Sequence, residues 1–302
     1  MSQHYPRIRV VTPSGYTRIR EGLNLTYYLP PRHPEYAQDV LRALDLYLRY
    51  VGQDALGLYA DMEGDWRKLN EAGWELMRKQ LREWECPLIS LNEDSPTGTR
   101  YAFYYRGKDE GFVTQVNKPD AMSEAIFWLP TEYLEEHGPG RVRELALELA
   151  TLLPVSSGFC GLSFNGELDL IGMDTQLLPY WKRHPGIDIP SPSGYAWDIG
   201  KRLRGPHWVN FLGQPLLGEL GAAAGLRERL KSPETTVQEL PGDKVVITLG
   251  TWPEAGDTEQ GGQLPAYREL ARVLEPWLYQ SAVSMLGQSK AETRRWERRF
   301  LD

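Results

Sequence analysis

Residues 23–31 read LNLTYYLPP, a run that predicts a buried β-strand ended by two prolines. Across residues 35–50, apolar side chains recur every three or four positions, which is the stripe of an amphipathic helix. A short strand is expected at residues 56–60, so the three segments predict a β-α-β unit. The apolar stripe consists of Val40, Leu41, Leu44, Tyr47, Leu48 and Val51.

Further elements are expected on both sides of this unit. Residues 7–12 predict an opening strand, and residues 100–105 and 111–117 predict an antiparallel pair whose charged turn is at 108–111. Another helix is expected to carry Trp66, Leu69, Trp74, Met77 and Leu81. Toward the end of the chain we expect a strand at 244–249, a glycine-rich loop at 256–262 and a helix at 266–286.

The second half of the chain repeats the first in outline. A strand at 125–129 ends at a proline and is followed by a helix at 142–153 and a strand at 161–165. The letters YLP at 28–30 match WLP at 128–130, and GLYA at 57–60 is similar to GLSF at 161–164. Because β-α-β units are common, duplication and coincidence both stay open at this point.

This order of elements predicts an α+β fold with mixed, largely antiparallel sheets and helices packed on one side. We expect a single compact domain over residues 1–302, with possible pseudo-repeated halves at 1–120 and 121–302. The ten Trp and sixteen Tyr favour a rigid core, because large buried rings need specific packing and a partner for each polar atom.

Charge and composition exclude several classes of function. The 34 basic and 41 acidic residues give a net charge of −7, which disfavours direct nucleic-acid binding and favours a basic partner or none. The first nine residues lack the apolar run of a signal peptide, and no later run is long enough for a membrane span, so we expect a cytoplasmic protein. Cys86 and Cys160 are far apart and are expected to be reduced and structural.

Catalytic motifs are weak throughout the chain. Residues 161–165 read GLSFN, which lacks the second glycine of a nucleophile elbow, so Ser163 reads as a strand residue. The five histidines have no zinc-site spacing, and no phosphate-binding loop is present. The carboxylates of Asp61, Glu63 and Asp65 could serve a hydrolase, although a solvated acidic loop is the commoner arrangement. We therefore predict no catalytic residues, no metal site, no cofactor and no enzyme activity.

A family resemblance enters in the central part of the chain. Residues 184–190 read HPGIDIP and are followed by Arg202, Gly205, the run WVNFLG at 208–213 and Pro215. This order, preceded by a strand such as SGFCGLS at 157–163, resembles the TsiV-type family of type VI secretion immunity proteins, formerly a domain of unknown function. The resemblance runs from about residue 126 to 278. It implies a protein that neutralises a cognate effector toxin by tight binding, with the toxin a nuclease of the restriction-endonuclease-like class.

The residues of this central motif are themselves expected to be structural. Gly186, Gly205 and Gly213 suit turns, and Trp208 suits a core. At the end of the chain, the basic run at 294–300 is expected to be a solvated helix with Trp296 and Phe300 packed against the protein.

For the surface that contacts a partner, the sequence points to acidic loops beside aromatic side chains, because Trp and Tyr anchors ringed by polar groups dominate binding energies. The predicted contact residues are Asp61, Glu63, Asp65, Trp66, Tyr104, Asp109 and Glu110. Two alternatives are a hydrolase that uses carboxylates and a scaffold or adaptor without catalysis. The sequence leaves the identity of the toxin and the oligomeric state open.

Overall fold

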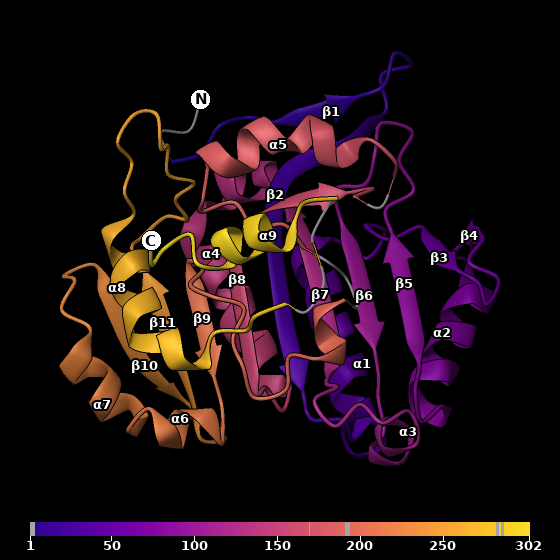
Figure 1. Ribbon diagram of the computed structural model, residues 1–302. Helices are drawn as coiled ribbons and strands as arrows, with labels where there is room; N and C mark the ends of the chain where they lie inside the picture. The colour runs from indigo at the N-terminus through magenta and orange to yellow at the C-terminus, as the bar shows by residue number, and fades with distance from the viewer. Residues whose placement is uncertain (1–3, 169, 191–193, 282–283, 285–286) are drawn as a thin grey trace.

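A large antiparallel sheet runs through the molecule and is built around β2 (Thr17–Leu29) (Figure 1). β2 pairs with β7 (Ser123–Pro130) along one edge and with β8 (Ser157–Gly166) along the other. The structure, a computed structural model, describes residues 4–168, 170–190, 194–281, 284 and 287–302. In these residues the sheet has eleven strands in the order β10-β11-β9-β8-β2-β7-β6-β5-β3-β4, with β1 paired to β2. The other strands are β1 (Arg9–Val11), β3 (Leu58–Ala60), β4 (Trp66–Lys68), β5 (Leu88–Asn92), β6 (Ala102–Arg106), β9 (Val209–Leu212), β10 (Thr235–Leu240) and β11 (Lys244–Leu249).

Two long helices, α1 (His33–Val51) and α4 (Thr131–Leu152), lie side by side behind the sheet in Figure 1. The hydroxyl of Tyr27 on β2 donates to the carbonyl of Ala146 on α4 at 2.8 Å, which fixes this helix against the sheet. Burial of the α1 stripe against the same face supplies the hydrophobic stabilisation that the periodicity predicts. The other helices are α2 (Glu71–Glu83), α3 (Glu110–Gln115), α5 (Met173–Arg183), α6 (Leu216–Glu219), α7 (Ala222–Arg229), α8 (Pro265–Leu274) and α9 (Lys290–Glu297).

The opposite face of the sheet's centre is covered largely by irregular backbone between α5 and β9. Asp188 lies beside Ser163 of β8, and its carbonyl accepts the N–H of Phe164 at 3.0 Å. The ring of His207 stacks on Phe159 of β8 with centroids 3.7 Å apart. Because both faces are covered, the middle of β2 is buried on each side.

The α+β fold is confirmed, and several elements fall where the sequence places them. The helix expected at 35–50 is α1, and the strands expected at 125–129, 161–165 and 244–249 lie within β7, β8 and β11. Among the described residues, no helix combines the length and apolar character that a membrane span requires. The single domain over residues 1–302 and the duplication of its halves stay predictions.

The antiparallel pair expected at 100–105 and 111–117 is wrong. Residues 110–115 form helix α3, whose first turn is capped by the carboxylate of Asp109, 2.7 Å from the N–H of Gly111. β6 pairs instead with β5, an element not foreseen, and with β7. A side-chain cap of this kind satisfies an orphan N–H and so favours a helix over a hairpin turn.

Two helix boundaries and one further strand also differ from the expectation. Trp66 lies in strand β4, because α2 begins only after Asn70, whose side chain caps Gly73 at 3.0 Å. The helix expected at 266–286 ends at Leu274 and continues as one 3-10 turn, Glu275–Trp277, where Pro276 cannot supply a backbone donor. Residues 282, 283, 285 and 286 of that range lie outside the described residues. Strand β10 was not foreseen.

Candidate partner-binding surface

The acidic loop at residues 61–65 is the tight turn of the β3-β4 hairpin. The Asp61 carboxylate accepts the N–H groups of Glu63 and Asp65 at 3.0 and 2.9 Å and the Nε of Arg67 at 2.8 Å. The hydrogen bond from Arg67 lowers the pKa of Asp61, so this carboxyl is ionised at neutral pH. Asp61 therefore builds the turn, and Arg67 offsets part of the negative charge of the turn.

Beside this turn, large apolar side chains are exposed. Trp66 is 46% exposed and Met62 is 71% exposed. Scattered exposed hydrophobic residues are normal, and Met62 lies against Gln80 of α2, whereas Trp66 lines a pocket.

Trp66 lines a pocket of about 300 Å³ on the face of the sheet away from α1, which we call the hairpin pocket. Its base is formed by Tyr104 and Trp128, whose rings meet edge to face with centroids 5.1 Å apart. The Tyr104 hydroxyl donates to Asn92 at 2.8 Å, which fixes the ring. The lining residues are Tyr16, Arg18, Leu58, Trp66, Asn92, Glu93, Ser95, Thr99, Tyr104, Trp128, Gly166 and Glu167.

The structure brings only some of the predicted contact residues together. Trp66 and Tyr104 share the hairpin pocket, and the turn at 61–65 precedes Trp66 directly. Asp109 and Glu110 lie at α3, which is at the bottom of Figure 1, away from the β3-β4 hairpin at the right edge of the sheet. There Asp109 caps α3, and Glu110 pairs with Arg32 at 2.9 Å.

Sequence reasoning missed most of the pocket lining. Tyr16, Asn92 and Trp128 come from separate segments of the chain that only sheet pairing brings together. The alternation of strand side chains could have placed Trp128 opposite the α1 face, but the pairing partner of β7 was not known from sequence.

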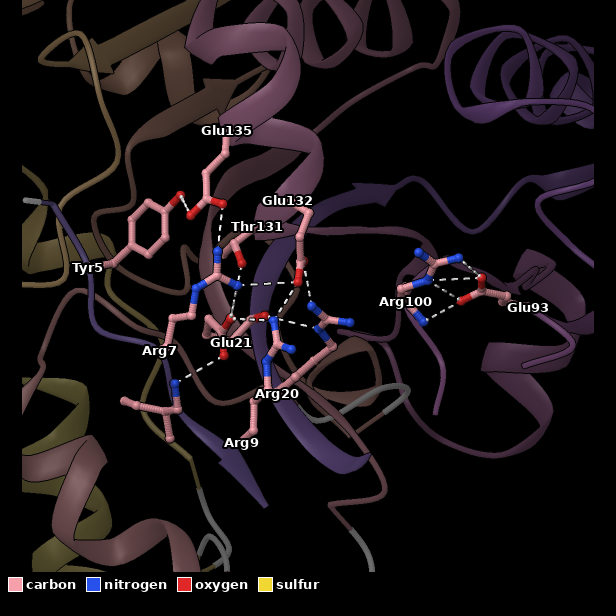
Figure 2. A network of polar contacts seen from close by, with 11 residues as sticks. Tyr5, Arg7, Arg9, Arg20, Glu21, Glu93, Arg100, Thr131, Glu132 and Glu135 are labelled. Carbon is pink, nitrogen blue, oxygen red and sulfur yellow. Dashed lines mark hydrogen bonds and ion pairs between the residues drawn. The ribbon is translucent and has the colours of Figure 1, made fainter. Parts of the chain in front are cut away.

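A charged network lies at the end of β2 near the first turn of α4 (Figure 2). Glu21 is fully buried and accepts the N–H of Ile8 and the hydroxyl of Thr131, each at 3.0 Å. The Glu132 carboxylate forms ion pairs with both Arg9 and Arg20. In Figure 2 these side chains point toward one another, together with Arg7 and Glu135.

The arginines of the network pair with carboxylates of the same network. Arg7, Arg9 and Arg20 are matched by three carboxylates. Burial by itself raises the pKa of Glu132, but its hydrogen bonds and the nearby arginines outweigh that effect and lower the pKa to about 2. These residues therefore hold β1 and α4 on the end of β2.

The central motif also forms a buried ion cluster. Asp188 lies 3.1 Å from Arg204, 3.2 Å from His207 and 3.4 Å from Arg299. Burial alone raises the pKa of Asp188, but Arg204 and His207 reverse this and hold it well below the usual range. The cluster is closed to solvent and joins the irregular segment to β8 and the end of the chain.

The motif's glycines and tryptophan are structural, as expected. A side chain at Gly186 would meet the carbonyl of Glu254 at 2.0 Å, and one at Gly213 would meet that of Val155 at 2.1 Å. Gly205 has a φ of +126°, which favours glycine. Trp208 is buried.

The geometry gives little support to the hydrolase alternative. Ser163 is fully buried, and its hydroxyl is hydrogen-bonded to Asn165, so it is not exposed as a nucleophile must be. A general acid needs a raised pKa, whereas the pKa of Asp61 is lowered by Arg67. Within the described ranges, no group of His, Cys, Asp and Glu is arranged to hold a metal ion.

Comparison with known proteins identifies the class. The model of the TsiV family, described as type VI immunity for VRR-NUC, matches residues 39–300. A solved structure described as Pseudomonas aeruginosa T6SS protein PA0821 shares the fold with a TM-score of 0.81. The two chains are 18% identical, and the match covers 97% of this chain and 87% of that one. A search of curated proteins finds no match. The chain belongs to the TsiV family of type VI immunity proteins.

Proposed function

We propose that this chain is a cytoplasmic immunity protein that binds and neutralises a cognate type VI effector, a nuclease of the VRR-NUC and restriction-endonuclease-like class. The family match over residues 39–300 carries this proposal. The net charge of −7 also supports it, since a nuclease presents a basic substrate cleft to which an acidic inhibitor is complementary.

For the contact surface we propose the hairpin pocket and its turn, with Asp61, Glu63, Asp65, Trp66 and Tyr104. A half-exposed Trp beside fixed aromatic rings has the composition of a binding hot spot. The acidic turn supplies the polar rim. Asp109 and Glu110 form a second, separate candidate region.

The proposal also holds that the protein acts by binding alone. The closed Asp188 cluster and the buried Ser163 support this, because their polar groups are used within the fold. The hydrolase and the scaffold are the competing functions.

The test is co-expression with the neighbouring effector in the cytoplasm. We expect restored growth and a stable purified complex. Trp66→Ala should raise the dissociation constant by about tenfold or more, because a hot-spot anchor contributes roughly 2 kcal/mol. Trp84→Ala is the matched control, since Trp84 is 37% exposed at the end of α2 and does not line the pocket.

Each alternative has its own outcome. Undiminished killing by a folded effector would reject the pairing. Turnover by the repurified protein that is lost in Asp61→Asn would favour the hydrolase, and a complex without protection would favour the scaffold. Unchanged affinity in the folded Trp66 variant would remove the hairpin pocket from the interface but not the immunity function.

A further inference from the structure

A second and larger cavity lies between α5, α8 and α9, with a volume of about 800 Å³. It is distant in the fold from the hairpin pocket, since α8 and the hairpin stand at opposite sides of the sheet in Figure 1. The volume is within the range of small-molecule sites. Its lining residues are Trp181, Lys182, Pro185, Thr258, Gly261, Gly262, Gln263, Arg268, Arg272, Glu292, Arg295, Trp296, Arg299, Phe300 and Asp302.

The cavity is cationic in a chain that is acidic overall. Five basic side chains line it against the two acidic residues Glu292 and Asp302. Glu292 is engaged by the cap of α9 and by Lys182 at 3.5 Å. Arg272 and Arg295 are exposed and have no ion pair within the part of the chain that the structure describes. The wall therefore has cations available for an external anion.

Two buried, stacked indoles form part of the same wall. Trp181 is 2% exposed and Trp296 is 6% exposed, and their rings stack with centroids 5.2 Å apart. In the described ranges neither Nε1 has a hydrogen-bond partner. Both Nε1 atoms are shielded from solvent, so the two indoles contribute apolar ring surface to the cavity wall.

We propose that this cavity binds a small oxyanion with two or more negative charges, of the phosphate or carboxylate class. Arg272 on α8 and Arg295 on α9 supply charge from two different helices. Guanidinium groups bind phosphate and carboxylate oxygens through charge-assisted hydrogen bonds. Arg299 lies over the Trp296 ring at 4.1 Å and is held by the carbonyl of Pro185, so it shapes the wall.

The test is isothermal titration of the purified full chain with inorganic pyrophosphate and, separately, with citrate at fixed ionic strength. We expect saturable binding at one site. Arg272→Gln and Arg295→Gln should each weaken it about tenfold, because each removes a charge-assisted contact. Arg294→Gln is the matched control, since Arg294 is exposed on the same helix but does not line the cavity.

Trp296→Phe is a further control. The Nε1 atom of Trp296 is shielded from solvent, so removing its N–H while keeping an aromatic ring should leave anion binding unchanged. Tighter binding of pyrophosphate than of citrate would assign the phosphate class, and the reverse would assign carboxylates. The proposal is overturned if neither probe saturates, or if binding is the same in the folded Arg272 and Arg295 variants as in the wild type.

Discussion

At the scale of single residues, His33 shows how burial fixes a protonation state. It is fully buried at the start of α1, with Nδ1 2.7 Å from the Tyr105 hydroxyl and Nε2 2.9 Å from the Leu81 carbonyl. A neutral ring that donates from Nε2 and accepts at Nδ1 satisfies both contacts. Burial lowers the pKa of His33, and the bond to Leu81 only partly opposes this.

The lowered pKa makes stability depend on pH in a definite direction. Below the ordinary histidine pKa of about 6.5, the unfolded chain takes up a proton that the folded site resists, so the free energy of unfolding falls as pH falls. We expect His33→Gln to reduce this loss between pH 7 and 5, by up to about 1.4 kcal/mol per pH unit. Burial also lowers the pKa of His207, so the free energy of unfolding of the His33 variant should still fall somewhat as pH falls.

Urea unfolding of both proteins at pH 7 and pH 5 measures this difference. His137→Gln is the matched control, because its ring is exposed on α4. Parallel stability curves for the wild type and the His33 variant would show that the native ring takes up its proton as readily as the unfolded one.

Single residues also show what composition can and cannot predict. The sequence correctly places Trp208, Trp296 and Phe300 in the interior, because each is large and lies among apolar neighbours. Trp66 has the same chemistry but is nearly half exposed, since β4 is a short strand at the edge of the sheet. Exposure of an aromatic residue is thus decided by the sheet order rather than by the residue itself.

At the scale of elements, the β3-β4 hairpin carries the acidic residues Glu63 and Asp65 in its turn and the proposed anchor Trp66 in its second strand. Reversal of Glu63 and Asp65 to Lys should slow association with a basic effector roughly threefold to tenfold at low salt, because rim charges act through long-range steering. It should also reduce the salt dependence. Asp61 is left unchanged because its carboxylate builds the turn.

Stopped-flow association at two salt concentrations tests this expectation. Glu110→Lys serves as the comparison, because Glu110 lies at the other end of the sheet. If the Glu110 variant is slowed and the hairpin variant is not, the region around α3 is the contact surface.

Elements with a strong local period could be predicted, and those that depend on distant partners could not. The stripe on α1 runs from Val40 to Val51, about three turns at 3.6 residues per turn, and its period is visible without any knowledge of tertiary contacts. β5 has only five residues, and its pairing with β3 and β6 is not written in its own sequence. The hairpin assigned to 100–117 failed for the same reason, because β6 finds its partners in β5 and β7.

At the scale of the whole molecule, the Asp188 cluster joins three parts of the chain. Asp188→Asn would leave the buried Arg204 and Arg299 without their counterion, which typically costs about 3–5 kcal/mol. We expect a large fall in the free energy of unfolding, measured with chemical denaturant. Asp257→Asn is the control, because its pair with Arg183 is solvated and should contribute little to stability.

The pairing of β2 also determines how early the centre of the sheet can form during synthesis. This strand leaves the ribosome early, yet its two long neighbours end at residues 130 and 166. The edge that pairs with β8 stays open until more than half of the chain has been made, and the apolar faces of β2 are uncovered for part of that time. Such non-local pairing is slow and exposed to aggregation. The centre of the sheet is therefore expected to close only after β8 has been made.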